Sequence, residues 1–266
     1  MTGYVHHLTV DLKSGIRDAT LMLMNYLFPI GFFLMVGLFM PTINPGFVDL
    51  MIPGMIVFAI MSGTLMTIPP TLIDQRESGI LRSYRVNGVP AGSLISIPVV
   101  GAVGHMTIVA AILTVLSALL YGAPLPANWA GFALTFVLTA LSFATLSVLI
   151  GIVASSSRTA TLLAQLVYLP SVLLGGLMVP EELLPVAVAR GASLLPATQA
   201  MRAFNTIAFA GEPLATAAGP LLVLAASVLV NLVLCGALFS WDPRTSRPRT
   251  FALLALVPFV AAVVLG

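Results

Sequence analysis

Charged side chains, the groups best suited to recognition or chemistry, gather in one short segment of this sequence. Residues 71–87 lie between a Pro-Pro pair and a glycine, and they hold five of the 20 charged residues. A short helix that mixes charged and apolar positions favours contact with a soluble partner at a membrane surface. We interpret the segment as such an amphipathic helix, with Ile80, Leu81 and Tyr84 set among Arg76, Glu77, Arg82 and Arg85.

Four polar residues stand alone within long apolar runs, namely Asn25, His105, Gln165 and Asn231. An ionisable side chain inside a membrane is a functional candidate, so His105 could line a translocation path or sense protons. A neutral histidine bonded to a nearby carbonyl is the simpler alternative. The three amide side chains either join helices, through hydrogen bonds worth about 0.6–2 kcal/mol, or contact a substrate directly. All four are possible pathway residues.

Motifs for catalysis are absent from the sequence. A phosphate-binding loop needs a glycine-rich turn followed by lysine and then serine or threonine, and the only lysine, Lys13, follows Leu12. Zinc-protease and Gly-x-Ser-x-Gly patterns are also missing. The single cysteine, Cys235, excludes an intrachain disulfide and a cysteine-rich metal site. We therefore expect no enzymatic activity, no metal site and no cofactor bound by this chain.

The composition indicates which elements must position these residues. Hydrophobic residues make up 59% of the 266 residues and charged residues only 8%, whereas a water-facing surface usually carries about 25–35% charged residues. The sequence therefore predicts an all-α, multi-pass membrane protein, surrounded by membrane lipids, with one transmembrane domain over residues 1–266. A net charge of +2 over this length is too small to indicate a nucleic-acid-binding surface, so we expect no nucleic-acid partner.

Uncharged runs of about 20 residues are long enough to cross the hydrocarbon core as helices. Residues 1–18 mix polar and apolar positions and predict an interfacial helix that leads into the first span. Residues 241–266 form a basic tail with a short apolar segment, which is either a thin seventh span or an interfacial helix. The six predicted spans are residues 19–40, 50–73, 93–120, 129–154, 161–179 and 214–239.

The distribution of lysine and arginine predicts the orientation of these spans. With the N-terminus inside, the inner segments hold nine of these residues, and the outer loops hold only Arg190 and Arg202. Short cytoplasmic loops carry an excess of positive charge. We therefore expect the N-terminus and residues 71–87 on the cytoplasmic side of the cell membrane.

The outer segment between the fifth and sixth spans, residues 180–213, is too apolar for a solvated loop. Prolines interrupt it at four positions, so it cannot form one long helix. Irregular backbone at membrane depth must be buried in protein or face a water-filled cavity. We predict a re-entrant helical hairpin that acts as an outer gate, with Pro180, Glu181, Pro185 and Pro196 as its candidate residues.

A set of short motifs occurs in a fixed order along residues 15–240. Together these motifs resemble the ABC-2 family of ABC exporter permeases, and in particular its drug- and lipid-exporting branch. Each motif is short, and the resemblance rests on their order and position. They are LFP at 27–29, LMIPG at 50–54, DQRESGILR at 74–82, GVP at 88–90, GGLMVPEELLP at 175–185 and LPAT at 195–198.

The resemblance implies a role for the charged segment and partners for the chain. In that family the Arg-Glu-x-Gly-x-Leu segment is a cytoplasmic coupling helix that docks on an ATPase subunit. The resemblance thus implies a permease subunit that exports a drug, lipid or glycolipid, with two ATPase subunits that bind ATP and Mg²⁺ and a second permease, identical or paralogous, completing a dimeric pore. A proton-coupled secondary transporter and a membrane scaffold subunit remain alternatives. The coupling residues implied are Arg76, Glu77, Gly79, Leu81 and Arg82.

Overall fold

The computed structural model describes residues 2–241 and 249–265, and over these ranges the chain is a bundle of helices without a strand. The predicted all-α membrane fold is thereby confirmed. Arg244 and Arg247 of the predicted basic tail lie outside the described residues.

Five helical stretches of the described chain are long and apolar enough to cross a membrane. Each coincides with a predicted span to within a few residues, because a helix buries its own backbone groups and needs only apolar side chains around it. They are Ala19–Ile43, Phe47–Glu77, Ala91–Tyr121, Trp129–Val153 and Leu214–Leu238.

The predicted span at residues 161–179 corresponds to α9 (Ser157–Leu174), which is not among these five stretches. The helix ends earlier than expected at a pair of glycines. Gly176 has a left-handed φ of 82°, and a Cβ on Gly175 would lie 2.3 Å from the carbonyl oxygen of Ser171. The helix therefore cannot continue through this pair, and the count of six spans stays a prediction.

The central helix of the bundle is α4 (Phe47–Leu65), which is buried along almost its whole length. It packs against α3 (Phe28–Ile43), α7 (Ala91–Tyr121) and α8 (Trp129–Val153), with α9 on another side. Gly54 lets the backbone of the loop after α9 pass close to α4, since a Cβ on Gly54 would lie 2.8 Å from the Leu177 carbonyl oxygen.

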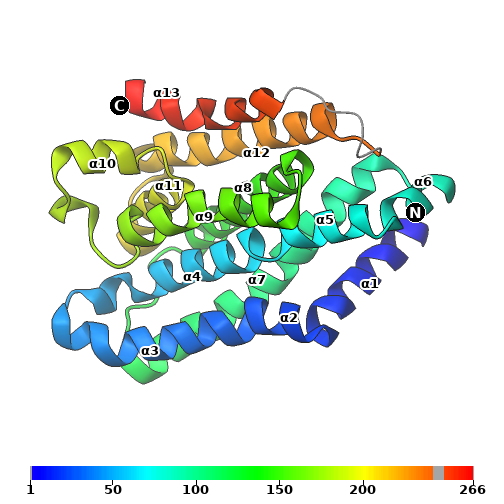
Figure 1. Ribbon diagram of the computed structural model, residues 1–266. Helices are drawn as coiled ribbons and strands as arrows, with labels where there is room; N and C mark the ends of the chain where they lie inside the picture. The colour runs from blue at the N-terminus through cyan, green and yellow to red at the C-terminus, as the bar shows by residue number, and fades with distance from the viewer. Residues whose placement is uncertain (1, 242–248, 266) are drawn as a thin grey trace.

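The bundle has two ends, which Figure 1 shows at the right and the left. The basic end carries the N-terminus, α5 (Ile68–Glu77), α6 (Ile80–Val86) and the turn between α8 and α9. The hairpin end carries the α3–α4 turn and α10 (Val186–Ala192). The residues predicted to be cytoplasmic and those predicted to lie outside are thus at opposite ends of the bundle.

Helix α1 (Thr2–Arg17) lies along the first half of α7 and runs in the same direction. The Tyr4 hydroxyl donates to Ser96 Oγ at 3.1 Å, and Leu12 reaches the backbone of α7 at Gly104. Asp18 then begins α2 (Ala19–Met22) as its N-cap and accepts from the amides of Thr20 and Leu21 at 2.9 Å. The interfacial position predicted for α1 stays a prediction.

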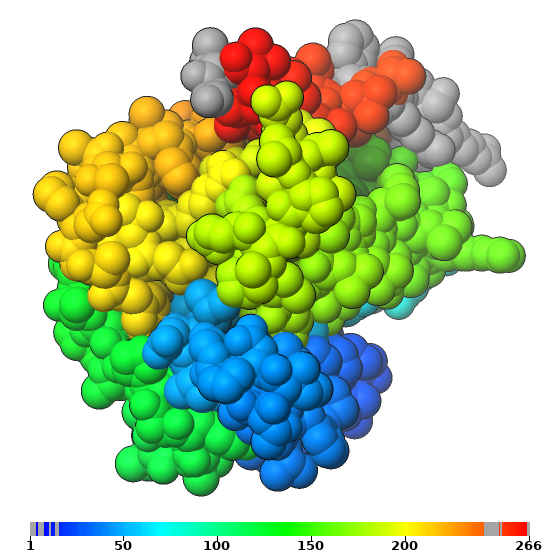
Figure 2. Space-filling view, turned by 90° about the vertical axis from the view of Figure 1, so that its left-hand side faces the viewer, coloured from blue at the N-terminus to red at the C-terminus, as the bar shows by residue number. Residues whose placement is uncertain are grey.

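The apolar tail, formed by η5 (Arg249–Leu256) and α13 (Val257–Leu265), folds back along α12 (Ala218–Leu238). Ala255 and Phe259 are buried in this contact region. The tail runs beside α12 from the basic end toward the hairpin end (Figure 1), rather than across one end of the bundle. In Figure 2, which looks onto the hairpin end, the red tail and the yellow-green hairpin share one face.

Candidate functional site

The charged segment at residues 71–87 forms two helices rather than the single helix predicted from the sequence. Helix α5 contains Pro69 and Pro70 in its first turn, where proline costs no hydrogen bond, and it continues to Glu77. The break comes at Ser78 and Gly79, and Gly79 has a φ of 78°, a conformation that glycine adopts without strain. We call residues 74–86 the α5–α6 elbow.

Two side chains fasten this elbow to the α8–α9 turn. The Arg76 guanidinium donates to the carbonyl oxygen of Ala154 at 2.7 Å and to that of Ile152 at 3.4 Å, at the C-terminal end of α8. A positive charge is favourable there because the last carbonyls of a helix have no intrahelical partner. The Ser157 hydroxyl, in the first turn of α9, donates to Asp74 Oδ1 at 3.1 Å. Arg76 thus braces the chain internally, and its contact with a partner stays a prediction.

The outward face of the elbow keeps most of the expected residues but not Leu81. Leu81, predicted to anchor a partner, is only 5% exposed because this chain itself covers it. Its apolar neighbours Ile80 and Val86 are 42% and 81% exposed. Glu77 and Arg82 are exposed as well, and Tyr84 is half-buried. The exposed surface of the elbow therefore has Ile80 and Val86 as its apolar residues and Glu77, Arg82 and Arg85 around them.

Asn25 and His105, two of the four pathway candidates, come together. Both are buried and line the same cavity, where α2 and η1 (Leu23–Leu27) meet α5 and α7. The hydroxyl of Tyr26 lies 2.6 Å from His105 Nδ1, so the histidine bonds to a side chain and not to a carbonyl. Asn25 Oδ1 and His105 Nε2 have no hydrogen-bond partner among the described residues.

The other two candidates lie elsewhere, so the four do not form one path. Gln165 on α9 donates to the sulfur of Met66 at 3.6 Å. Asn231 on α12 is buried against α8 and donates to Thr145 Oγ1 at 3.3 Å. One turn or so away, the hydroxyls of Ser142 and Ser227 lie 2.6 Å apart across the same interface. Asn231 therefore joins two helices, as buried polar side chains in membrane bundles commonly do.

The predicted outer hairpin consists of short helices that begin at the prolines. Pro180 precedes η2 (Glu181–Leu183), Pro185 precedes α10, and Pro196 occupies the first turn of α11 (Pro196–Ala203). Proline suits these positions because its φ is helical and it has no amide hydrogen to leave unpaired. Helix α11 and the following η3 (Phe204–Phe209) are largely buried against α4, α8 and α12. Re-entry of this hairpin into the membrane stays a prediction.

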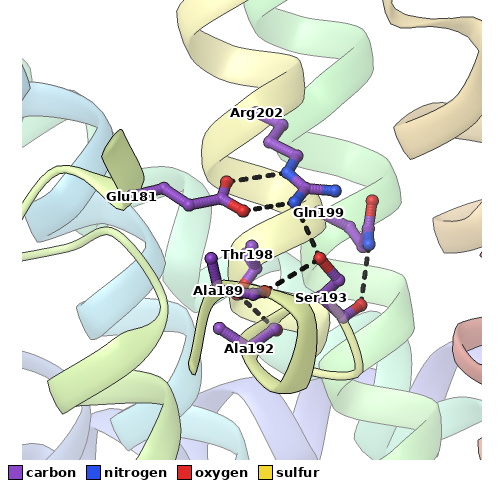
Figure 3. Close-up of polar contacts among 7 residues, drawn as sticks. All are labelled: Glu181, Ala189, Ala192, Ser193, Thr198, Gln199 and Arg202. Carbon is purple, nitrogen blue, oxygen red and sulfur yellow. Dashed lines mark hydrogen bonds and ion pairs between the residues drawn. The ribbon is translucent and has the colours of Figure 1, made fainter. Parts of the chain in front are cut away.

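An ion pair closes the hairpin at the surface (Figure 3). Arg202 donates to both carboxylate oxygens of Glu181, with Nε lying 2.8 Å from Oε2, and its Nη2 also donates to Ser193 Oγ at 2.7 Å. This hydrogen bond to Glu181 raises the pKa of the Arg202 guanidinium above its usual value. Gln199 and Thr198 donate to the carbonyl oxygens of Ser193 and Ala192, so α10 and α11 are also joined directly.

Sequence reasoning assigned Arg202 only to the outer charge count and missed this pairing. Glu181 and Arg202 are 21 residues apart, a separation with no helical or strand periodicity behind it. The one available signal was the presence of an arginine in an apolar segment predicted to lie outside. A charged residue in such a segment usually has a partner of opposite charge.

Comparison with known protein families decides the broader classification. The model of the ABC-2 type transporter family matches residues 8–209, about three quarters of the chain. The chain belongs to the ABC-2 type transporter family. No curated protein and no solved structure matches it. The family match includes the elbow, the cavity beside Asn25 and the outer hairpin of this ABC-2 protein, and it ends before α12 and the tail.

Membership in the ABC-2 family makes this chain a membrane transport component. It is multi-pass, because several of its helices are long and apolar enough to cross a membrane. Many of the charged side chains among the described residues lie in the elbow and the hairpin, at the two ends of the bundle, and the long helices between these ends are mostly apolar.

Proposed function

We propose that this ABC-2 protein is the permease subunit of an ATP-driven exporter of amphipathic cargo. Separate cytoplasmic ATPase subunits, two per transporter, bind and hydrolyse ATP with Mg²⁺. A second permease, identical or paralogous, completes the pore. The cargo is a drug, a lipid or a glycolipid, because the long helices between the two ends of the bundle offer a mostly apolar interior. The N-terminus and the basic end face the cytoplasm in this proposal.

The α5–α6 elbow carries the proposal. A device that transmits movement needs a face for the partner and a stiff connection to the helices that move. The elbow has exposed apolar and charged residues on one side, and Arg76 and Asp74 bond it to the α8–α9 turn on the other. Helix α5 also continues α4, the central helix, so a push on the elbow reaches the middle of the bundle.

The outer hairpin supplies the gate in this proposal. Movement of α4 acts on it directly, because α11 packs against α4 as well as against α8 and α12. The bonds among Glu181, Arg202 and Ser193 hold the hairpin closed, and cargo leaves when α11 shifts. An ion pair that is partly exposed suits a gate, since such pairs contribute only about 0–1 kcal/mol and are readily exchanged for water.

Aspartate substitutions on the exposed face test the proposal. Ile80→Asp and Val86→Asp place a charge in the apolar part of the proposed contact, and we expect both variants to lose co-purification with the ATPase subunit. Val186→Asp, at an exposed position of the hairpin end, is the matched control and should keep the complex. Leu81→Asp is not a clean test, because a charge at this buried position disturbs the fold of the chain itself.

Co-purification and export measurements together separate the two alternatives. Co-purification of both elbow variants at wild-type levels would contradict the docking surface. Export that needs a proton gradient and continues without any ATPase would identify a secondary transporter. Absence of export with an intact complex would identify a scaffold subunit.

A further inference from the structure

A cavity at the basic end has two adjoining parts. The deep chamber, about 70 Å³, is lined by Asn25 and His105 among others. The mouth, about 420 Å³, opens to the surface beside Asp18 and Asp74. Both parts are lined by Leu21, Thr67, Thr71 and Gln75, so the mouth leads to the deep chamber. The proposed coupling and gating roles leave this cavity without a ligand.

The deep chamber holds two buried polar atoms that the chain leaves unsatisfied. Asn25 is 6% exposed and His105 is 5% exposed, and neither Asn25 Oδ1 nor His105 Nε2 has a partner among the described residues. Burial of an unpaired polar atom costs about 1–3 kcal/mol. When the Tyr26 hydroxyl donates to His105 Nδ1, Nε2 carries the hydrogen. Asn25 and His105, which line the chamber, thus carry one unpaired acceptor and one unpaired donor at its wall.

The mouth is acidic. Asp18 and Asp74 line it, and none of its lining residues is lysine or arginine. Arg76, the nearest arginine along the chain to Asp74, bonds instead to the end of α8. Each carboxylate uses one oxygen for a local hydrogen bond, to the amides of α2 or to Ser157, and keeps acceptor capacity for a further donor. Two carboxylates in one opening attract positive charge.

Four apolar side chains of the mouth form an adaptable part of its wall, beside the polar Thr67, Thr71 and Gln75. Met24, Met66, Leu21 and Ile80 line the mouth, and methionine side chains fit ligands of varied shape. The combined space is within the range of about 300–1,000 Å³ that small-molecule sites occupy. An apolar body fits these walls, with a positive group at the mouth.

We propose that this cavity is the uptake site for an amphipathic cation, that is, an ammonium or similar cation on an apolar body. The ammonium lies between Asp18 and Asp74, the body contacts the methionines, and a polar group of the ligand bonds to Asn25 and His105. The inference rests on the proposed function in taking the ligand to be cargo. It narrows the cargo from amphiphiles in general to those that carry positive charge.

Equilibrium binding to the full-length chain tests the site without any transport measurement. The chain is placed in phosphatidylcholine nanodiscs, without ATPase or nucleotide, and binding of rhodamine 6G, an amphipathic cation, is followed by fluorescence anisotropy against empty nanodiscs. We expect Asp18→Asn with Asp74→Asn to weaken binding about tenfold or more, because two favourable charge interactions are lost. Asparagine keeps the N-cap of α2 and the acceptor for Ser157. Asn25→Leu should weaken binding by a smaller factor.

Controls make the result specific. Glu212→Gln removes an exposed carboxylate outside the cavity and should bind rhodamine 6G as the wild type does. Carboxyfluorescein, an anion of similar size, should not compete. In the wild-type chain, higher salt should weaken binding, and this measurement stays valid if a variant fails to fold. Equal binding by the wild type and the doubly substituted chain, or equal competition by the anion, would overturn the proposal and leave a water-filled cavity.

A further comparison distinguishes the sources of the cation. Phosphatidylethanolamine added to the nanodiscs displaces rhodamine 6G if the natural ligand is a lipid ammonium, and leaves it bound if the ligand is a soluble cation; either result supports the site. Failure of the proposed ATPase coupling leaves this binding unchanged, because no ATPase is present. If the cavity variants bind rhodamine 6G as the wild type does, the co-purification result with the ATPase subunit is still unaffected.

Discussion

Arginine side chains at both ends of the bundle bond to the chain's own groups. Arg76 donates to carbonyl oxygens at the end of α8, and Arg202 pairs with Glu181. In each case several donors of one guanidinium link segments that are far apart in sequence, which a lysine ammonium does with less geometric constraint. Arg76, predicted to bind a partner, and Arg202, counted only for topology, therefore also hold the structure together.

Arg76→Ala tests the bracing role at the residue scale. The change leaves the Ala154 carbonyl without its charged donor, and we expect a loss of about 1–2 kcal/mol of stability at this end of α8. Export should fall while the complex with the ATPase subunit persists, because Arg76 does not lie on the exposed face. Thermal unfolding and co-purification measure the two effects. Arg85→Ala, at an exposed position of the same elbow, is the control and should leave the unfolding temperature unchanged.

The elbow is the element in which backbone conformation matters most. Helices α5 and α6 meet at Gly79 in the left-handed region, and a Cβ there would meet nothing within 4 Å. A substitution at this glycine therefore acts through backbone strain alone. Two consecutive prolines, at positions 69 and 70, do not break α5, because they fall in the first turn of this helix, where no amide hydrogen bond is lost.

Gly79→Ala tests the elbow at the element scale. We expect it to cost about 1–2 kcal/mol locally, since a left-handed conformation is unfavourable for a residue with a Cβ. The angle between α5 and α6 should change, so ATPase co-purification should weaken without loss of membrane insertion. Gly31→Ala, within α3 and also free of contacts, should instead be neutral or stabilising by up to about 1 kcal/mol. Similar behaviour of both variants would show that the turn carries no conformational demand.

The whole molecule separates its charged segments to two ends, and this arrangement agrees with the charge bias of the sequence. The tail adds a feature that composition left open, because it lies lengthwise beside α12 and ends toward the hairpin end. An interfacial helix would instead lie across the bundle axis. Whether this segment crosses the membrane stays a prediction.

Cysteine labelling tests orientation and tail together. In a Cys235→Ala background, we expect a cysteine at Arg82 to be shielded from impermeant thiol reagents in intact cells and one at Glu182 to be labelled. A cysteine at Val264, an exposed position near the end of α13, should also be labelled if the tail crosses. Labelling at position 82 would reverse the orientation. Protection at position 264 with labelling at position 182 would return the tail to the inner surface.

The class, the positions of the long apolar helices and the family resemblance could all be predicted from the sequence. These features depend on the hydropathy of consecutive residues: an apolar run of sufficient length predicts a helix that can cross a membrane, whatever it packs against. The proline-bounded hairpin segment was also predictable, because prolines set helix boundaries locally.

Which side chains face one another depends on how the helices pack. Helices in a membrane are apolar on all sides, so periodicity does not distinguish a buried face from an exposed one. The burial of Leu81, the turn of Arg76 toward α8 and the pairing of Arg202 with Glu181 therefore had no signal in spacing. The same holds for the cavity, which brings Asn25 and His105 together from helices 80 positions apart because those helices pack side by side.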